Sequence, residues 1–358
     1  MSAQPTPLVP GATLGLDVSD RYTHFCLVDA AGTVCEHGRF ATTPAAARAW
    51  LGARPALRVV LETGTHSPWL SRVAAECGHE VLVANARRVR LIAESDRKTD
   101  RRDAELLARV GRLDPALLSP ITHRTAAAQE DLALLRARDA LVRTRTLLVN
   151  HVRGALKAVG VQLAACSTPS FARRARAAVP EGLRDAMTPL LDTLERLSAE
   201  VRGYDARVEA LIAARHPEAR RVRQVGGVGP ITALCFVLTL GDPARFRHSR
   251  AVGAYLGLRP RQRDSGDAAP QLRISKTGDV MLRKLLVGAA QYVLGPFGPD
   301  TDLRRWGTAL VARGGRSAKK RAVVATARKL AVLLHRLWVT GAPYVPLRAA
   351  GTPACATA

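Results

Sequence analysis

The segment KTDRRDAELLARV combines a helical apolar stripe with two carboxylates. The apolar side chains recur at helical spacing and are therefore expected to face a protein core: Leu106, Leu107, Val110 and Leu113. Three to four residues back along the same stripe stand Asp103 and Asp100. Carboxylates on a face that should be buried need compensation, and a bound cation supplies it.

Two further acidic residues occupy places where apolar ones are expected. In LGLDVS the apolar residues point to one side of a strand and Asp17 to the other, and Glu62 ends the apolar strand LRVVLE. Carboxylates on a central strand and on a helix crossing the sheet can converge. Hard oxygen ligands suit Mg²⁺, and two such ions can clamp a scissile phosphate. We therefore predict a two-Mg²⁺ catalytic site made of Asp17, Glu62, Asp100 and Asp103.

Each of these acids also fits an ordinary structural role. Asp17 could be a turn residue at a strand end, and Glu62 could be solvated at a strand edge. Asp100 could cap its helix, with Asp103 in the first turn, where the helix dipole favours negative charge. The four together, in this order and in a strongly basic chain, favour the metal site.

The elements that position these acids begin with three short strands. They are rich in β-formers and separated by polar or glycine turns, at residues 12–19, 23–30 and 32–40. Helices and strands then alternate, at 44–53, 57–62, 67–78 and 80–84. This order predicts an α/β domain of ribonuclease H-like architecture.

The rest of the chain is predicted to be helical. Apolar residues recur every seven positions between 124 and 159, which is typical of a coiled-coil helix about 50 Å long. A second stripe runs from Leu190 to Leu211, so the two helices could pair within the chain or with another subunit. We predict four parts: a metal-dependent catalytic domain (1–115), coiled-coil or oligomerisation helices (116–215), a mainly α C-terminal domain (216–346) and a disordered tail (347–358).

The charge balance points to a polyanionic partner. The chain has 54 Lys and Arg against 30 Asp and Glu, a net charge of +24, and such a protein is expected to bind nucleic acid. The six cysteines are dispersed without metal-ligand spacing. No signal peptide and no apolar run long enough to span a bilayer is found, which predicts a reduced, cytoplasmic protein without a membrane partner.

Two C-terminal motifs could contact phosphates. VGGVGPITA places Gly226, Gly227 and Gly229 before a helix, as in a helix-hairpin-helix loop, although an ordinary glycine turn fits as well. A basic helix near the end offers Lys319, Lys320 and Arg321.

The loop RPRQRDSGDAAPQLRISKTGD surrounds a serine with cations. A hydroxyl such as that of Ser265 can attack a phosphodiester when nearby cations stabilise the developing charge. Those cations are Arg261, Arg263, Arg273 and Lys276. By spacing alone a turn role explains Ser265 better than a catalytic one, and Ser275 and Ser249 are weaker candidates for the catalytic role.

These motifs resemble those of the transposases of the insertion sequence 110 family, including its 1111 subgroup. GLDVS, LETGTHSPWL and KTDRRDAELLA resemble the N-terminal half of that family, and GGVGPITA, AYLGLRPRQRDSG and RISKTGDVMLRKLL resemble its C-terminal domain. The resemblance implies a RuvC-like domain whose DEDD set falls on the four acids above, and a catalytic serine at Ser265. It also implies a homodimer or homotetramer that recombines element-end and target DNA with a structured guide RNA.

Combined with the residues, the resemblance predicts an RNA-guided DNA transposase that acts through a covalent phosphoserine. The alternative is a RuvC-like junction endonuclease that hydrolyses DNA with metal-activated water. A sugar-kinase-like ATPase would need a second phosphate loop and an adenosine motif, and neither is found. A non-enzymatic nucleic-acid scaffold leaves the core-facing acids unexplained.

Overall fold

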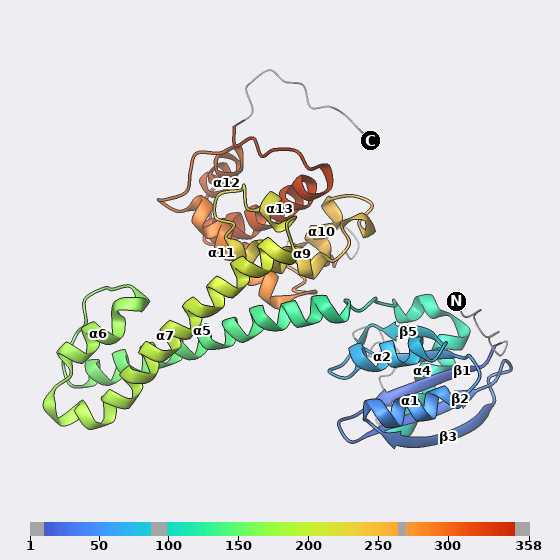
Figure 1. The fold of residues 1–358 in the computed structure, drawn as a ribbon. Coiled ribbons are helices and arrows are strands. Elements are labelled where there is room, and N and C mark those ends of the chain that lie inside the picture. Colours follow the sequence, from blue (N-terminus) through green and yellow to red (C-terminus); the bar gives the residue numbers. More distant parts are fainter. Residues whose placement is uncertain (1–10, 87–98, 264–269, 271, 348–358) are drawn as a thin grey trace. The chain divides into compact units, whose positions relative to one another are not determined.

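A computed structural model shows that the chain divides into two compact units, Met1–Thr125 and Ala126–Ala358 (Figure 1). The structure describes residues 11–86, 99–263, 270 and 272–347. The sequence-based boundaries at 115, 215 and 346 stay a prediction.

The first unit is built on a five-stranded mixed sheet with the order β3-β2-β1-β4-β5. The strands are β1 (Thr13–Val18), β2 (Tyr22–Val28), β3 (Val34–Ala41), β4 (Arg58–Glu62) and β5 (Glu80–Ala84). The first three strands form an antiparallel meander, whereas β4 and β5 run parallel to β1. This topology confirms the predicted ribonuclease H-like fold.

Helices cover both faces of this sheet. On one face, α1 (Pro44–Gly52) and α2 (Ser67–Glu76) bury an apolar core that includes Leu14 and Leu16. On the other face lies α4 (Asp100–Leu113), which buries small residues against β1 and β2. A 3₁₀ turn, Pro115–Leu118, follows it. The alternation of β1 therefore sends its leucines toward α1 and α2, and Gly15 and Asp17 toward α4.

The second unit begins with two long helices, α5 (Ala126–Ala158) and α7 (Arg184–Arg215), with the short α6 (Thr168–Ala178) and a 3₁₀ turn (Glu181–Leu183) between them (Figure 1). The two long helices pack antiparallel within the chain. Arg138 near the start of α5 pairs with Asp205 near the end of α7, at 2.6 Å. Of the two pairings left open by the sequence, the structure contains the intrachain hairpin.

The remaining helices pack around a buried segment. Every residue of α9 (Pro230–Leu240) from Thr232 onward is buried, so this helix forms the centre of the C-terminal core. Its neighbours in sequence are α8 (Ala219–Val222), the 3₁₀ turn Pro243–Arg245, α10 (Arg250–Tyr255), α11 (Val280–Leu294), α12 (Asp302–Ala312) and α13 (Ala318–Thr340). Within the described ranges, no helix is both long and apolar enough to cross a bilayer.

Candidate active site

The sheet register places three polar side chains in one row on the face that α4 covers. Asp17 of β1 stands directly opposite His24 of β2 in the antiparallel ladder. In the parallel ladder Leu16 is paired with Leu61 of β4, so the next row brings Asp17 beside Glu62. Side chains in such rows lie about 5 Å apart at Cβ. The register therefore aligns His24, Asp17 and Glu62 across the middle of the sheet.

Glycine allows α4 to lie close to this row. A Cβ on Gly15 would stand 2.0 Å from the carbonyl oxygen of Ala104 and 2.6 Å from the nitrogen of Ala108, so only glycine fits. On the helix side, a Cβ on Gly111 would stand 2.4 Å from Val60. The close packing at both points brings the first turn of α4, with Asp100 and Asp103, over the end of β1 that carries Asp17.

The packing face of α4 differs in part from the predicted stripe. The buried residues are Ala104, Leu107, Ala108 and Gly111. Leu113, predicted to face the core, is 72% exposed. The prediction was wrong there because the helix packs through small residues, which a hydrophobic pattern does not highlight. Asp100 does not cap the helix, as the alternative role given above would require. The cap is Thr99, whose hydroxyl accepts from the Arg102 nitrogen.

Arginines fix α4 on the sheet. Arg109 donates to the Gly32 carbonyl at 2.8 Å, and Arg112 donates to the Ala30 carbonyl at 3.0 Å. Both carbonyls belong to the turn between β2 and β3. These bonds hold the helix in register with the strands, which sets where its acidic first turn lies.

The four carboxylates interact electrostatically at Asp17. The pKa of Asp17 is raised from 3.8 to about 6, chiefly by burial. The negative charges that raise this pKa further are those of Asp103, Asp100 and Glu62, and the nearby His24 lowers it. Like charges held close together disfavour ionisation. The raised pKa is what a cluster of carboxylates without its cation is expected to have.

The donor set fits a divalent cation by its chemistry. Carboxylate oxygens are hard ligands that suit Mg²⁺ or Mn²⁺, and a cation would remove the repulsion that raises the pKa of Asp17. In the described part of the chain, no three histidine, cysteine or acidic side chains stand close enough together to hold an ion as they are. Asp17, Glu62, Asp100 and Asp103 are the carboxylates that could hold such a cation.

His24 is a polar residue near these acids that sequence reasoning missed. Its Nδ1 lies 3.3 Å from Oδ2 of Asp100. The sequence places His24 in a predicted strand, but its contact with Asp100 depends on how α4 crosses the sheet. No signal in the sequence reports that crossing.

The predicted nucleophile, Ser265, lies outside the described residues. The chain on either side of it is paired: the Arg261 nitrogen donates to the Arg273 carbonyl at 3.0 Å, and the Ser275 nitrogen donates to the Arg259 carbonyl at 2.9 Å. The four predicted cations of this arm are all exposed: Arg261, Arg263, Arg273 and Lys276. They are therefore available to a ligand.

The weaker serine candidates have partners inside the protein. The hydroxyl of Ser275 is 2.9 Å from that of Thr277. The hydroxyl of Ser249 lies 2.9 Å from Nδ1 of His335, a buried residue whose Nε2 donates to the Pro243 carbonyl at 3.1 Å. In the neutral imidazole with Nε2 as the donor, Nδ1 is the acceptor for the Ser249 hydroxyl. This bond ties the start of α10 to α13.

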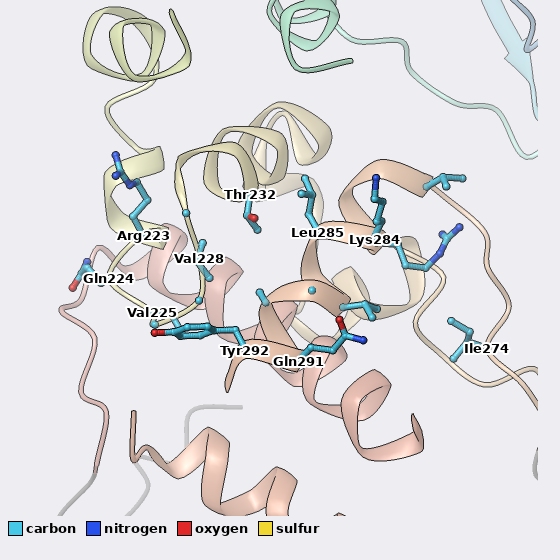
Figure 2. A pocket seen from close by; sticks show the side chains of 18 of the residues that line it. Arg223, Gln224, Val225, Val228, Thr232, Ile274, Lys284, Leu285, Gln291 and Tyr292 are labelled. Carbon is cyan, nitrogen blue, oxygen red and sulfur yellow. The ribbon is translucent and has the colours of Figure 1, made fainter. Parts of the chain in front are cut away.

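An open groove of about 1150 Å³ lies between the glycine loop 225–229 and α11. Tyr292 meets that loop at Gly227. Figure 2 shows Lys284 and Ile274 farther along the groove. Lys276 also lines it, so the groove reaches the arm that flanks Ser265. Its lining joins apolar side chains with cations, a combination suited to nucleic acid.

The three predicted glycines differ in their surroundings. A Cβ on Gly226 would stand 3.0 Å from Pro299. Gly227 has φ +87°, and its Cβ would stand 3.0 Å from the Tyr292 ring and 3.1 Å from the Ala289 carbonyl oxygen. Nothing lies within 4 Å of a Cβ on Gly229, the cap of α9. Protein packing thus accounts for the first two, and the phosphate contact stays a prediction.

The predicted basic helix is α13, and its first turn is unusually positive. Lys319, Lys320 and Arg321 are all exposed there, and the turn has no acidic residue. Cations are unfavourable at a helix N-terminus because the helix dipole is positive there. Their accumulation is therefore not explained by helix stability.

The fold and the acids together define the class of protein. A mixed sheet of this order, with acids on β1, on β4 and on the helix that covers them, is the architecture of ribonuclease H-like enzymes with an acidic site. Family comparison agrees: a model of the DEDD transposase domain of the IS110 family matches residues 14–160, and one described as "Transposase IS116/IS110/IS902 family" matches residues 219–302.

The chain belongs to the IS110 family of DNA transposases. It is 34% identical to the transposase for insertion sequence element IS1111A of Coxiella burnetii over 67% of this chain and 66% of that protein. It is 31% identical to a probable family 20 transposase of Pseudomonas aeruginosa over 72% of this chain and 78% of that protein. The transposase for element IS1328 of Yersinia enterocolitica is 28% identical over 79% and 84% of the two chains. A DEDD transposase is a metal-dependent enzyme.

Proposed function

We propose that this transposase exchanges DNA strands through a covalent phosphoserine, with its acidic site formed by Asp17, Glu62, Asp100 and Asp103. The observation that carries the acidic site is the placement of these acids on β1, on β4 and in the first turn of α4, close enough that the other three carboxylates add to burial in raising the pKa of Asp17 to about 6. A half-buried carboxylate whose pKa is raised by three neighbouring carboxylates has no evident structural use, whereas a divalent cation would turn this repulsion into binding.

The acidic residues would bind and orient the scissile phosphate. Mg²⁺ held by their carboxylates, as two ions in our proposal, supplies electrostatic stabilisation of the charge that develops on the phosphate oxygens. Asp17 would bind the ions from the sheet side of the site, since it lies on the central strand β1. Asp100 and Asp103 approach from α4, and Glu62 from β4, so the donors come from three separate elements.

Ser265 would supply the nucleophile. Its Oγ forms a bond to phosphorus and loses its proton, and the bond from phosphorus to the departing strand breaks, leaving that strand with a hydroxyl. A hydroxyl of the second DNA then attacks the phosphoserine, which restores a phosphodiester and frees Ser265. Each step exchanges one phosphate ester for another, so no ATP is needed.

The C-terminal unit would hold the nucleic acid. The groove beside Gly226, Gly227 and Gly229, with Lys276 on its wall, adjoins the arm of exposed arginines. The positive first turn of α13 offers a second contact. Each neutralised phosphate releases counterions, so we expect removal of one such cation to weaken binding equally for all sequences and to lower the salt dependence.

We also propose that the enzyme works as a homodimer or homotetramer with a guide RNA. The net charge of +24 supports a polyanionic partner, and the family resemblance suggests that this partner includes RNA from the element itself. The decisive comparison is strand exchange with and without that RNA. If exchange between element ends and target is equally efficient without RNA, the guidance proposal is wrong.

The covalent step is tested by trapping the protein–DNA adduct on a denaturing gel. Ser265→Ala should abolish both the adduct and strand exchange, whereas Ser275→Ala, a serine of the same arm, should retain the adduct. Asp17→Asn should prevent cleavage altogether. The alternative enzyme, a junction endonuclease that hydrolyses DNA, would keep cutting after Ser265→Ala and form no adduct, and that result would replace our mechanism.

A further inference from the structure

His24 lies within the acidic row without being an acid. It stands opposite Asp17 in the ladder between β1 and β2, and its Nδ1 is 3.3 Å from Oδ2 of Asp100 on α4. The imidazole therefore touches an acid from the helix and neighbours one from the sheet. Its side chain is 23% exposed and that of Asp100 is 60% exposed.

The Nδ1 atom of His24 is buried and makes no hydrogen bond to any described residue. The contact with Asp100 is short enough for an ion pair but lacks hydrogen-bond alignment. A buried polar nitrogen without a hydrogen bond is costly and calls for an explanation, such as a catalytic role or an ion nearby. The Asp100 carboxylate, with Oδ2 at 3.3 Å, is an acceptor that a small rotation would align with the ring nitrogen.

We propose that His24 is a positioning residue for the metal site: its Nδ1–H holds the Asp100 carboxylate toward Asp17, so that both reach the same cation. The inference rests on the proposed function of the four acids. A carboxylate only accepts hydrogen bonds when ionised, so Nδ1 must carry the proton in this contact. Asp100 is exposed, whereas Asp17 is half-buried. A hydrogen bond from His24 would keep the Asp100 carboxylate from turning toward water.

Hydrogen bonds of this kind matter for metal affinity. Residues that orient a metal-ligating side chain typically contribute about 10- to 100-fold to affinity when they are removed. We therefore expect His24→Ala to weaken Mn²⁺ binding by about that factor. His24→Asn should restore most of the affinity, because the amide nitrogen of asparagine stands where Nδ1 stands and also donates.

The experiment is a calorimetric titration of the full-length protein with Mn²⁺, which needs no DNA and no catalysis. His37→Ala is the matched control: His37 lies on the adjacent strand β3, is exposed, and contacts Arg101 and not a carboxylate. It should bind Mn²⁺ as the wild type does. A thermal unfolding curve of each variant shows whether it is folded, and His24→Asn provides the comparison if the alanine variant is not.

A double-mutant cycle tests whether His24 acts through Asp100. In an Asp100→Asn background, His24→Ala should cause little further loss of Mn²⁺ affinity, since the group that it orients is already changed. Equal losses in both backgrounds would show that His24 acts independently of Asp100, and the inference would be wrong.

The failures of the two proposals look different. If the wild type binds no Mn²⁺, or if Asp17→Asn binds it as tightly as the wild type does, the metal site itself is refuted. If wild type binds Mn²⁺ through Asp17 but His24→Ala binds it equally tightly or more tightly, the site stands and the positioning role of His24 is refuted.

Discussion

Asp17→Asn should stabilise the metal-free protein while abolishing catalysis. The folded state raises the pKa of Asp17 from 3.8 to about 6 because the carboxylate is buried and surrounded by negative charge. The ionised side chain therefore destabilises the folded protein near neutral pH. Asparagine has nearly the same shape and carries no charge, so the substitution removes this destabilisation.

The magnitude follows from the pKa. A rise from 3.8 to about 6 corresponds to about 3 kcal/mol at a pH above both values. Asp17 is only partly buried, so solvent screening reduces this to about 1.5 kcal/mol. For the unit Met1–Thr125, this corresponds to a rise in Tm of about 6 °C.

The sign of the pH dependence is definite. Above pH 6 the folded protein holds an ionised Asp17 and the penalty is complete. As the pH falls from about 6 toward 3.8 the folded state takes up the proton before the unfolded state does, so the penalty fades. The stability advantage of Asp17→Asn should therefore be largest at pH 8 and should vanish near pH 4.

The assay is thermal unfolding in the presence of a chelator at several pH values. Asp20→Asn is the control, since the side chain of Asp20 is 99% exposed, and it should change the free energy of unfolding by less than about 0.5 kcal/mol. Added Mn²⁺ should raise the Tm of the wild type but not of Asp17→Asn. An Asp17→Asn variant that is less stable than wild type at pH 8, or whose advantage does not change with pH, would refute the reasoning.

Three further substitutions test the packing. Gly15→Ala should destabilise the protein by about 2–3 kcal/mol, because its Cβ would meet the α4 backbone; Gly64→Ala, with nothing within 4 Å, is the control in chemical denaturation. Gly227→Ala should cost about 1–3 kcal/mol through its φ of +87° and the Tyr292 contact, and an unchanged denaturation midpoint would contradict this. Asp131→Ala should cost about 1.5–3 kcal/mol by removing two charge-assisted bonds at the base of the hairpin, from Arg215 at 2.9 Å and His216 at 2.8 Å, as measured by urea unfolding.

The sheet and its helices could be predicted from the sequence because local signals agree there. The strands β1, β4 and β5 each begin and end within a residue or two of the predicted ranges. Alternation also predicted that Asp17 points away from the leucines of β1. These features depend on neighbouring residues and on the turn signals between them, which the sequence carries directly.

The features that the sequence could not predict depend on how the helix α4 crosses the sheet. The Gly15 contact sets the distance of α4 from the sheet, and no periodicity reports it. For the same reason Leu113 was placed in the core, although the helix buries alanine and glycine instead. His24 looked like one more polar residue of a strand, because its partner Asp100 is distant in the chain.

The pairing of the long helices could not be predicted for a different reason. A heptad pattern specifies an apolar seam but not whether the partner belongs to the same chain. In the structure the two helices pair within the chain, and Arg138 of α5 donates to Asp205 of α7. The chemistry assigned to Ser265 still rests on its motif and on the exposed cations that flank it.

Whether four acids from β1, β4 and α4 meet around one cation is tested most directly by a crystal soaked in Mn²⁺. Anomalous scattering should show a peak within ligand distance of Asp17 and of at least two of Glu62, Asp100 and Asp103, about 2.0–2.2 Å from the carboxylate oxygens. A fully soaked crystal with no peak beside Asp17, or with Mn²⁺ bound only elsewhere, would contradict the proposed catalytic site.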